Sequence, residues 1–136
     1  MYVTELSNQA AVSPDTVRYY SKIGMLKPTR NAGNGYQVYG HKDVRRLRFI
    51  RAAKSLGYTL ADIRAMFADA DHGDSPCPRV RAVIEKRIHE TEVRLAELTA
   101  LHAKMKHALE AWRVLPDSAP SGDSVCALIE SLQDAP

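Results

Sequence analysis

The sequence SPDTVRYY at residues 13–20 decides the fold of the first half of this chain. Ser13 is a favoured residue at a helix N-cap and Pro14 suits a first helical turn, so we expect a helix that runs to Ile23. Apolar spacing predicts a shorter helix before it, over Thr4–Ala10. Two short helices joined by a tight turn predict a helix-turn-helix.

The next informative stretch is RNAGNGYQVY at residues 30–39, which predicts a β-hairpin. Asn34-Gly35 is a favoured two-residue hairpin turn, and the alternation of Tyr36 and Val38 after it is typical of a strand. A helix-turn-helix followed by such a wing, rich in basic and aromatic residues, indicates binding to nucleic acid.

A second pair of helices is expected after the wing, over Lys42–Leu56 and Leu60–Ala68. Thr59, followed three residues later by Asp62, forms a capping pattern for the second of them. The outer face of the first carries a basic cluster, which suits phosphate contacts. Its members are Lys42, Arg45, Arg46 and Arg48.

Charge divides the chain in two. Residues 1–67 contain 11 Lys and Arg against 4 Asp and Glu, whereas residues 68–136 contain 8 against 12. Only the first half therefore has the charge of a polyanion-binding protein.

A long helix is predicted in the second half. From Ile84 to Trp112, mostly apolar residues recur at alternating steps of four and three, with the polar Thr91 and His102 at two of the positions. This is the pattern of a coiled-coil seam. About 34 helical residues would span about 50 Å, too long a stripe for so small a chain to cover. We expect a partner helix, most simply a second copy. The alternative is a helix that folds back on the N-terminal half.

The chain has two cysteines, Cys77 and Cys126. Neither a membrane span nor a signal peptide is apparent, so we expect a cytoplasmic protein with no membrane partner. Thiols stay reduced there, so metal binding or thiol reactivity is favoured over a structural disulfide.

These features resemble the MerR family of bacterial transcription regulators. The resemblance covers nearly the whole chain and rests on Thr-Val-Arg-Tyr-Tyr at 16–20, Arg-Asn-x-x-Asn-Gly-Tyr at 30–36, the long helix and the cysteine-bearing C-terminal loop. It implies a mainly α fold in four parts. These are a winged helix-turn-helix domain with a small β-wing and a second helix pair (1–68), a linker (69–79), an antiparallel dimerisation coiled-coil helix (80–113), and a C-terminal effector loop with a short helix (114–136).

The resemblance implies a homodimer on double-stranded DNA, at a pseudo-palindromic promoter operator. A signal changes the dimer geometry, which distorts the DNA so that RNA polymerase can use the promoter. The residues that would contact DNA are Thr16, Arg18 and Tyr19, with Tyr20 partly packing the helix, and Arg30, Asn34, Gly35 and Tyr36 from the wing. Two positions depart from the family pattern: Gln37 stands where a basic residue is common, and Ser21-Lys22 replaces an acidic-then-basic pair.

The metal-sensing branch of the family resembles this chain in the positions of Cys77 and Cys126. The resemblance implies a divalent ion bound across two subunits, without distinguishing Zn, Cd, Pb or Hg. Trp112 stands roughly where those sensors carry a further cysteine. Two thiolates suffice for linear Hg²⁺, but tetrahedral Zn²⁺ or Cd²⁺ needs two more ligands. The candidates for these are His72, His107, Asp117 and Asp123.

Three other classes are weighed against metal sensing. A thiol-based regulator that responds to oxidants or electrophiles would use the same two cysteines and remains the alternative. A drug-binding regulator is disfavoured, because the 24 residues after Trp112 cannot enclose a drug-sized pocket. An enzyme is excluded, because no paired carboxylate, nucleophile motif or Gly-rich phosphate loop is present.

Overall fold

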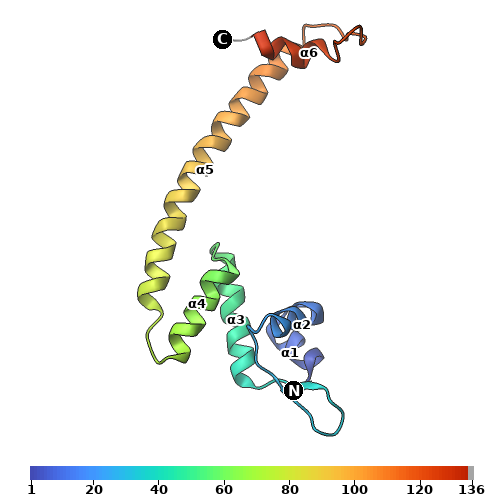
Figure 1. Ribbon diagram of the computed structural model, residues 1–136. Coiled ribbons are helices and arrows are strands. Elements are labelled where there is room, and N and C mark those ends of the chain that lie inside the picture. The colour runs from blue at the N-terminus through green and yellow to red at the C-terminus, as the bar shows by residue number, and fades with distance from the viewer. Residues whose placement is uncertain (135–136) are drawn as a thin grey trace. The chain divides into compact units, whose positions relative to one another are not determined.

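The computed structural model describes residues 1–134 and confirms a mainly helical fold with a small two-stranded wing (Figure 1). The elements are α1 (Val3–Ala10), α2 (Pro14–Lys22), β1 (Thr29–Arg30), β2 (Gln37–Val38), α3 (His41–Ser55), α4 (Leu60–Asp71), α5 (Cys77–Trp112), α6 (Ala127–Glu130) and a 3-10 turn (Ser131–Asp134). The chain forms two compact units, Met1–Arg87 and a second that begins at Ile88. Among the described helices, none is both long enough and apolar enough to cross a membrane.

The first unit has one apolar core. Helix α1 packs against α2 and α3, and α4 packs against α3 (Figure 1). The core residues are Leu6, Ala10, Val17, Tyr20, Met25, Leu26, Tyr39, Val44, Leu47, Ile50, Ala53, Tyr58, Ile63, Met66 and Phe67. Because this core contains residues from α1 through α4, the helix-turn-helix and the second helix pair form one rigid body.

Local capping sets the helix ends in the first unit. Helix α1 ends where Ala11 adopts a left-handed conformation with φ of 56°, which turns the chain toward α2. The Ser13 hydroxyl accepts a hydrogen bond from Thr16 N at 3.1 Å, as its predicted N-cap role requires. Helix α2 stops at Lys22, one residue before the predicted end, and Gly24 follows with φ of +82°.

Helix α4 extends further than its apolar pattern indicated. The predicted cap is confirmed: Thr59 Oγ1 accepts from Asp62 N at 3.1 Å, and Asp62 Oδ2 accepts from Thr59 N at 2.8 Å. The helix continues to Asp71, and α5 already begins at Cys77, so residues 72–76 alone separate them within the predicted 69–79 linker.

Three aspartates of α4 hold neighbouring elements in place. Asp62 accepts from Arg87 Nη2 at 2.8 Å, and both oxygens of Asp69 accept from Arg79, at 2.7 and 3.1 Å. Asp71 pairs with Arg46 of α3. A hydrogen bond from an arginine is the main reason that the pKa of each of these carboxyls lies below its usual value. Two of the three aspartates, Asp62 and Asp69, thus fasten the first part of α5 to α4.

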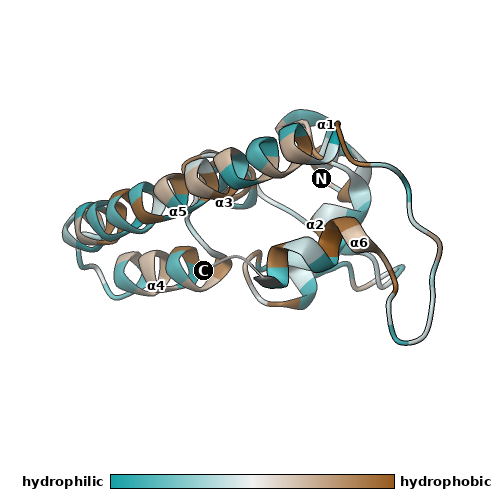
Figure 2. Cartoon of the chain, turned by 90° about the horizontal axis from the view of Figure 1, so that it is seen from above, coloured by the Kyte–Doolittle hydropathy of each residue, from teal (hydrophilic) through white to brown (hydrophobic). Residues whose placement is uncertain are grey.

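Most of the α5 apolar stripe has no cover within its own chain. Val80, Val83 and Ile84 are half-buried against the core of the first unit, but no residue of this 36-residue helix is fully buried. Between Arg87 and Trp112, each large apolar side chain of α5 is at least 45% exposed, whereas Trp112 itself is half-buried. The exposed residues are Ile88, Val93, Leu95, Leu98, Leu101, Met105 and Leu109. Figure 2 shows hydrophobic and hydrophilic residues alternating along the helix.

The charge-assisted cap of α4 generates a stability prediction. Asp62→Ala is expected to lower the free energy of unfolding by about 2 kcal/mol at neutral pH, because it removes the carboxylate's bonds to Thr59 N and to Arg87. The folded-state pKa of Asp62 is lowered, so its stabilising effect is present above the unfolded carboxyl pKa of about 4 and is lost as the pH falls through the folded value.

Urea unfolding followed by circular dichroism, at one fixed protein concentration, measures this effect. The difference between wild type and variant should narrow as the pH is lowered from 7 toward about 3. Asp74→Ala, which removes an exposed carboxylate from the segment between α4 and α5, is the matched control and should change little. Equal stability of Asp62→Ala and Asp74→Ala would show that the bond to Arg87 does not contribute.

Candidate nucleic-acid interface and cysteine segments

Helix α2 presents one face to the core and the other to solvent. Val17 is fully buried and Tyr20 is 7% exposed, whereas Tyr19 is 50% exposed and Arg18 is also exposed. This difference follows from the helical period, since positions 17 and 20 lie on one face of the helix and positions 18 and 19 lie outside that face. Among the predicted DNA-contacting residues, Tyr20 therefore packs the helix onto the core instead of offering an accessible ring.

Two polar residues at the start of α2 are already engaged. Thr16 is half-buried, and its hydroxyl lies 2.8 Å from the Ser13 hydroxyl. The Arg18 guanidinium donates to Asp15 at 2.9 Å, and both of these side chains are largely exposed. A surface ion pair of this kind is weak, so the arginine is free to exchange its carboxylate partner for a phosphate or a base edge.

The wing is a hairpin, but its loop is longer than predicted. Strands β1 and β2 are antiparallel, and beyond them Asn31 N donates to Tyr36 O at 2.8 Å. The loop between Asn31 and Tyr36 has four residues, 32–35. The Asn31 carbonyl accepts a hydrogen bond from Gly35 N and not from Tyr36 N. The two-residue turn predicted for Asn34-Gly35 is therefore wrong. Within residues 32–35, only Gly35 has a positive φ, of +73°. The Asn34 carboxamide oxygen accepts a hydrogen bond from Tyr36 N at 3.0 Å.

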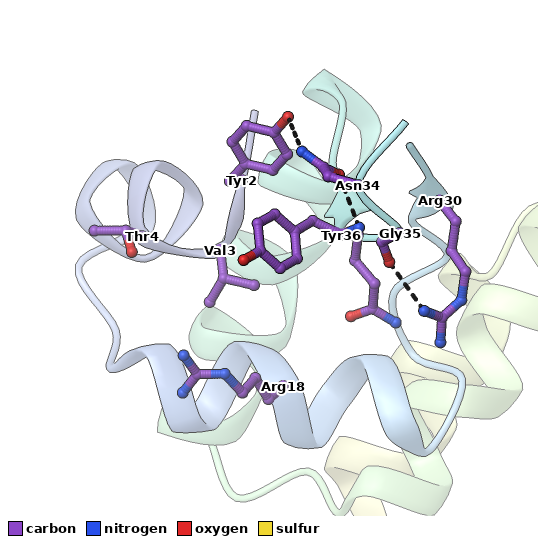
Figure 3. A pocket seen from close by; sticks show the side chains of 9 residues that line it. Tyr2, Val3, Thr4, Arg18, Arg30, Asn34, Gly35 and Tyr36 are labelled. Atoms are coloured by element: carbon purple, nitrogen blue, oxygen red, sulfur yellow. Dashed lines mark hydrogen bonds between the residues drawn. The ribbon is translucent and has the colours of Figure 1, made fainter. Parts of the chain in front are cut away.

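The wing, α2 and the start of α1 surround an open hollow of about 760 Å³ (Figure 3). It is lined by Tyr2, Val3, Thr4, Arg18, Arg30, Asn34, Gly35, Tyr36 and Gln37. The structure thus brings together five predicted DNA-contacting residues from two separate motifs. Thr16, Tyr19 and Tyr20 do not line this hollow.

Tyr2 is a residue of this hollow that the sequence analysis missed. Its ring packs edge-on against Tyr36, with ring centroids 6.1 Å apart, and its hydroxyl accepts from Asn31 and Asn34 at 3.3 and 3.4 Å (Figure 3). These contacts fix the wing against α1. An aromatic residue directly before a helix was the available signal, but no local pattern connects it to a loop about 30 residues away.

The two departures from the family pattern meet in space. The Tyr39 hydroxyl lies 2.6 Å from the Ser21 hydroxyl and donates to Gln37 Oε1 at 3.0 Å. Ser21 also donates to Val17 O at 2.9 Å. The two hydroxyls supply only two protons for these three contacts, so two of the three are hydrogen bonds at any one time. The buried Tyr39 hydroxyl thus lies between Ser21 of α2 and Gln37 of strand β2 and can bond to either.

The basic cluster on α3 is only partly available to phosphates. Arg46 is largely buried: it pairs with Asp71, and its guanidinium lies 4.4 Å from the centre of the Phe67 ring. Arg48 donates to Gln9 O at 3.5 Å, a carbonyl near the C-terminal end of α1. The prediction that Arg46 belongs to an outer phosphate-binding face is wrong, because the ion pair and the aromatic ring hold it inward.

The two cysteines are free thiols in different units. Cys77 is exposed at the first residue of α5, and its backbone N–H donates to Ser75 Oγ at 3.2 Å. Cys126 is half-buried at the N-cap of α6. Within residues 1–134 of one chain, no three His, Cys, Asp or Glu side chains are grouped closely enough to hold a metal ion.

The further candidate ligands lie apart from one another along the chain. His72 is exposed at the C-cap of α4, and Asp117 and Asp123 are exposed in the loop after α5. His107 lines a hollow of about 530 Å³ in the second unit, together with Trp112 and Leu132.

Two protein-family models match this chain, one over its first half and one that extends into its second half. Residues 1–70 match the model of the MerR HTH family of regulatory proteins, and residues 44–108 match a model described as MerR, DNA binding. The HTH-type transcriptional regulator ZntR of Escherichia coli K12 is 31% identical over 96% of this chain and 91% of its own length. Heavy metal-dependent transcription regulator 2 of Rhizobium meliloti is 32% identical over 97% of this chain and 86% of its own.

A solved structure has the same fold. The transcription regulator PbrR691 from Ralstonia metallidurans CH34, in complex with lead(II), superposes with a TM-score of 0.77. The match covers 97% of this chain and 98% of that one, at 24% sequence identity.

The hydrogen bonds at Tyr39 give a prediction for the DNA-binding unit. Tyr39→Phe should lower the free energy of unfolding by about 1 kcal/mol, because Gln37 loses its donor and Ser21 loses a partner in a half-buried setting. Tyr36→Phe removes an exposed hydroxyl and is the matched control. Urea unfolding of the two variants makes the comparison, and a Tyr39→Phe variant as stable as the control would argue against this link.

Proposed function

The chain belongs to the MerR family of HTH regulatory proteins, and on that premise we propose that it activates a promoter by distorting operator DNA when a divalent metal ion binds between two copies of the chain. The family consists of DNA-binding transcription regulators and not of enzymes, which confirms the prediction that the chain is not an enzyme. The observation that carries the metal proposal is the pair of free thiols, Cys77 and Cys126, on either side of the exposed stripe of α5 in the sequence.

DNA contacts in the proposal come from α2 and the wing. Arg18 and Tyr19 project from the exposed face of α2, and Arg30 and Tyr36 are exposed on the wing. An α-helix fits the major groove, while a wing contacts the adjacent backbone. Thr16, Asn34 and Gly35 complete the contact set, and Tyr20 supports it by fixing α2 on the core. Operator half-sites related by two-fold symmetry require two such units.

A second copy of the chain is the natural cover for α5. Its seam residues from Ile88 to Leu109 are about half exposed or more, and burying such side chains releases about 25 cal/mol per Å². A seam at heptad spacing is built to pack against another helix. In the antiparallel dimer implied by the family, the start of one α5 lies beside the end of its partner, so that Cys77 of one chain meets Cys126 of the other.

Each of the two thiols could supply one ligand to a metal ion that binds between two chains. Each is free, and thiolates favour Zn²⁺, Cd²⁺, Pb²⁺ and Hg²⁺ over oxygen-seeking ions. The absence of a three-residue ligand group among residues 1–134 of one chain agrees with ligands shared between two chains. His72, His107, Asp117 and Asp123 remain candidates for any additional ligand. In this proposal, RNA polymerase starts transcription from the distorted promoter.

A thiol-based signal is the second candidate, and the exposure of Cys77 favours it. An accessible thiol can be oxidised or alkylated without any metal. Chelation reverses metal binding but not thiol oxidation, which separates the two signals in the same DNA-binding protein.

For DNA binding, Arg18→Ala should weaken operator affinity by about 10-fold, the range of a single specific arginine contact. If Arg18 contacts phosphate, the salt dependence should also flatten by about one unit of slope. Asp15→Asn is the matched variant and should raise affinity, since it frees Arg18 and removes a negative charge facing DNA. Fluorescence anisotropy across salt concentrations measures both, on a duplex that the wild-type protein selects from random-sequence DNA. Wild-type affinity in Arg18→Ala would remove Arg18 from the interface.

For the metal site, anaerobic titration with each divalent ion should saturate at up to two ions per dimer, and Cys77→Ser or Cys126→Ser should abolish tight binding. Thiolate-to-metal absorbance measures the stoichiometry, and light scattering measures the mass of the dimer.

Mixing the two variants tests where the ligands come from. A dimer with one Cys77→Ser chain and one Cys126→Ser chain keeps one intact cross-subunit pair, so it should bind one ion. Failure of this mixed dimer to bind, alongside binding by wild type, would indicate a site within a single chain. No binding by wild type would favour the thiol-based alternative.

A further inference from the structure

The segment that carries Cys126 is organised around one carboxylate. Glu130 Oε1 accepts hydrogen bonds from Ser124 Oγ at 2.7 Å and from Cys126 N at 3.1 Å, and Glu130 Oε2 accepts from Val125 N at 3.3 Å. Three donors from consecutive residues thus converge on a single side chain.

We propose that Glu130 is a positioning residue for Cys126, whose carboxylate holds residues 124–126 in the conformation that presents the thiol as a ligand. This inference rests on the proposed function in that it takes Cys126 to be a metal ligand. Glu130 is not one of the candidate metal ligands. The position of the Cys126 thiol depends on its carboxylate.

The local helix geometry explains how Glu130 reaches its partners. Glu130 N donates to Cys126 O at 3.0 Å, so one helical turn sets the two residues against each other. The backbone N–H groups at the start of a helix have no partner within the helix. Here the Glu130 carboxylate takes those of Val125 and Cys126, and Ser118 Oγ accepts from Ala127 N at 3.2 Å.

A carboxylate is the side chain best suited to this position. It is an acceptor only, with lone pairs for several donors, and hydrogen bonds to an ionised group are about twice as strong as neutral ones. The Ser124 hydroxyl, followed by the two backbone N–H groups, lowers the pKa of Glu130 below its usual value. All three donors thus find an acceptor oxygen on this one side chain.

Packing offers little alternative support to this segment. No residue of α6 is buried, and Val125 and Ile129 are 75% and 55% exposed. The preceding turn is held by reciprocal backbone bonds between Ser121 and Ser124, at 2.9 and 3.3 Å. Within the described residues, hydrogen bonds rather than a core thus hold the Cys126 segment, and those to Glu130 are the ones that reach the cysteine itself.

Order in the free protein has a consequence for metal binding. Fixing a flexible residue costs backbone entropy, and a segment already fixed does not incur that cost when the ion binds. Loss of the carboxylate should therefore weaken metal binding without altering the DNA-binding unit, which lies in residues 1–87.

The test uses the metal-free and metal-bound protein. In a Cys77→Ser background, the rate at which uncharged iodoacetamide alkylates Cys126 reports how well the segment is held; Glu130→Gln should raise this rate several-fold. In the otherwise wild-type chain, Glu130→Gln should weaken metal binding by about 10-fold, as loss of a residue that orients a ligand does. Operator affinity should stay at the wild-type value.

Two further variants separate position from charge. Glu130→Asp keeps the charge but shortens the reach, so it should behave like Glu130→Gln if positioning is the role. Glu110→Gln removes an exposed carboxylate of α5 and should leave both the alkylation rate and the metal affinity unchanged.

An alkylation rate for Glu130→Gln equal to wild type would overturn the inference, and so would a Glu130→Asp variant that matches wild type, since charge alone would then suffice. Because alkylation is measured without metal, it decides the role of Glu130 even if the wild-type chain binds no ion. In that case the proposed metal function fails separately.

Discussion

Helix α5 carries more apolar surface than its own chain covers, and this imbalance governs the rest of the molecule. Its first turns pack Val80, Val83 and Ile84 onto the core of the first unit, while the large apolar residues from Ile88 to Leu109 stay exposed. An exposed stripe of this length is unfavourable in water and favours association. The same helix therefore belongs to the DNA-binding unit at one end and to the proposed dimer contact along the remainder.

The start of α5 is fastened to the DNA-binding unit by polar contacts as well as by packing. Asp62 and Asp69 of α4 bind Arg87 and Arg79, and the buried Tyr58 donates to Val80 O at 2.7 Å. Cys77 lies two residues before Arg79, so a change at this cysteine acts on a segment already anchored to α4. In the proposed function, these contacts are the route by which a ligand at Cys77 acts on the first unit.

The two ends of the chain are stabilised by different physics. The first unit has an apolar core shared by four helices, and this core supports the side chains that we propose contact DNA. The Cys126 segment has almost no buried residue and relies on the Glu130 carboxylate and a short turn. The order of the Cys126 segment thus depends on a few hydrogen bonds, whereas the order of the first unit depends on burial of apolar side chains.

Local patterns in the sequence determined the helices, the caps at Ser13 and Thr59, the wing and the heptad stripe, because each depends on residues within a few positions of one another. The resemblance of the sequence to a known family singled out five of the residues around the hollow, and the sequence itself singled out both cysteines. Only the tertiary structure decided the contacts between distant residues: Tyr2 with Tyr36, and Ser21 with Gln37 through Tyr39. It also drew Arg46 inward, extended α4 to Asp71 and lengthened the wing loop to four residues. No sequence period encodes which distant partner an ionised or hydroxyl group meets, since that depends on how the helices pack.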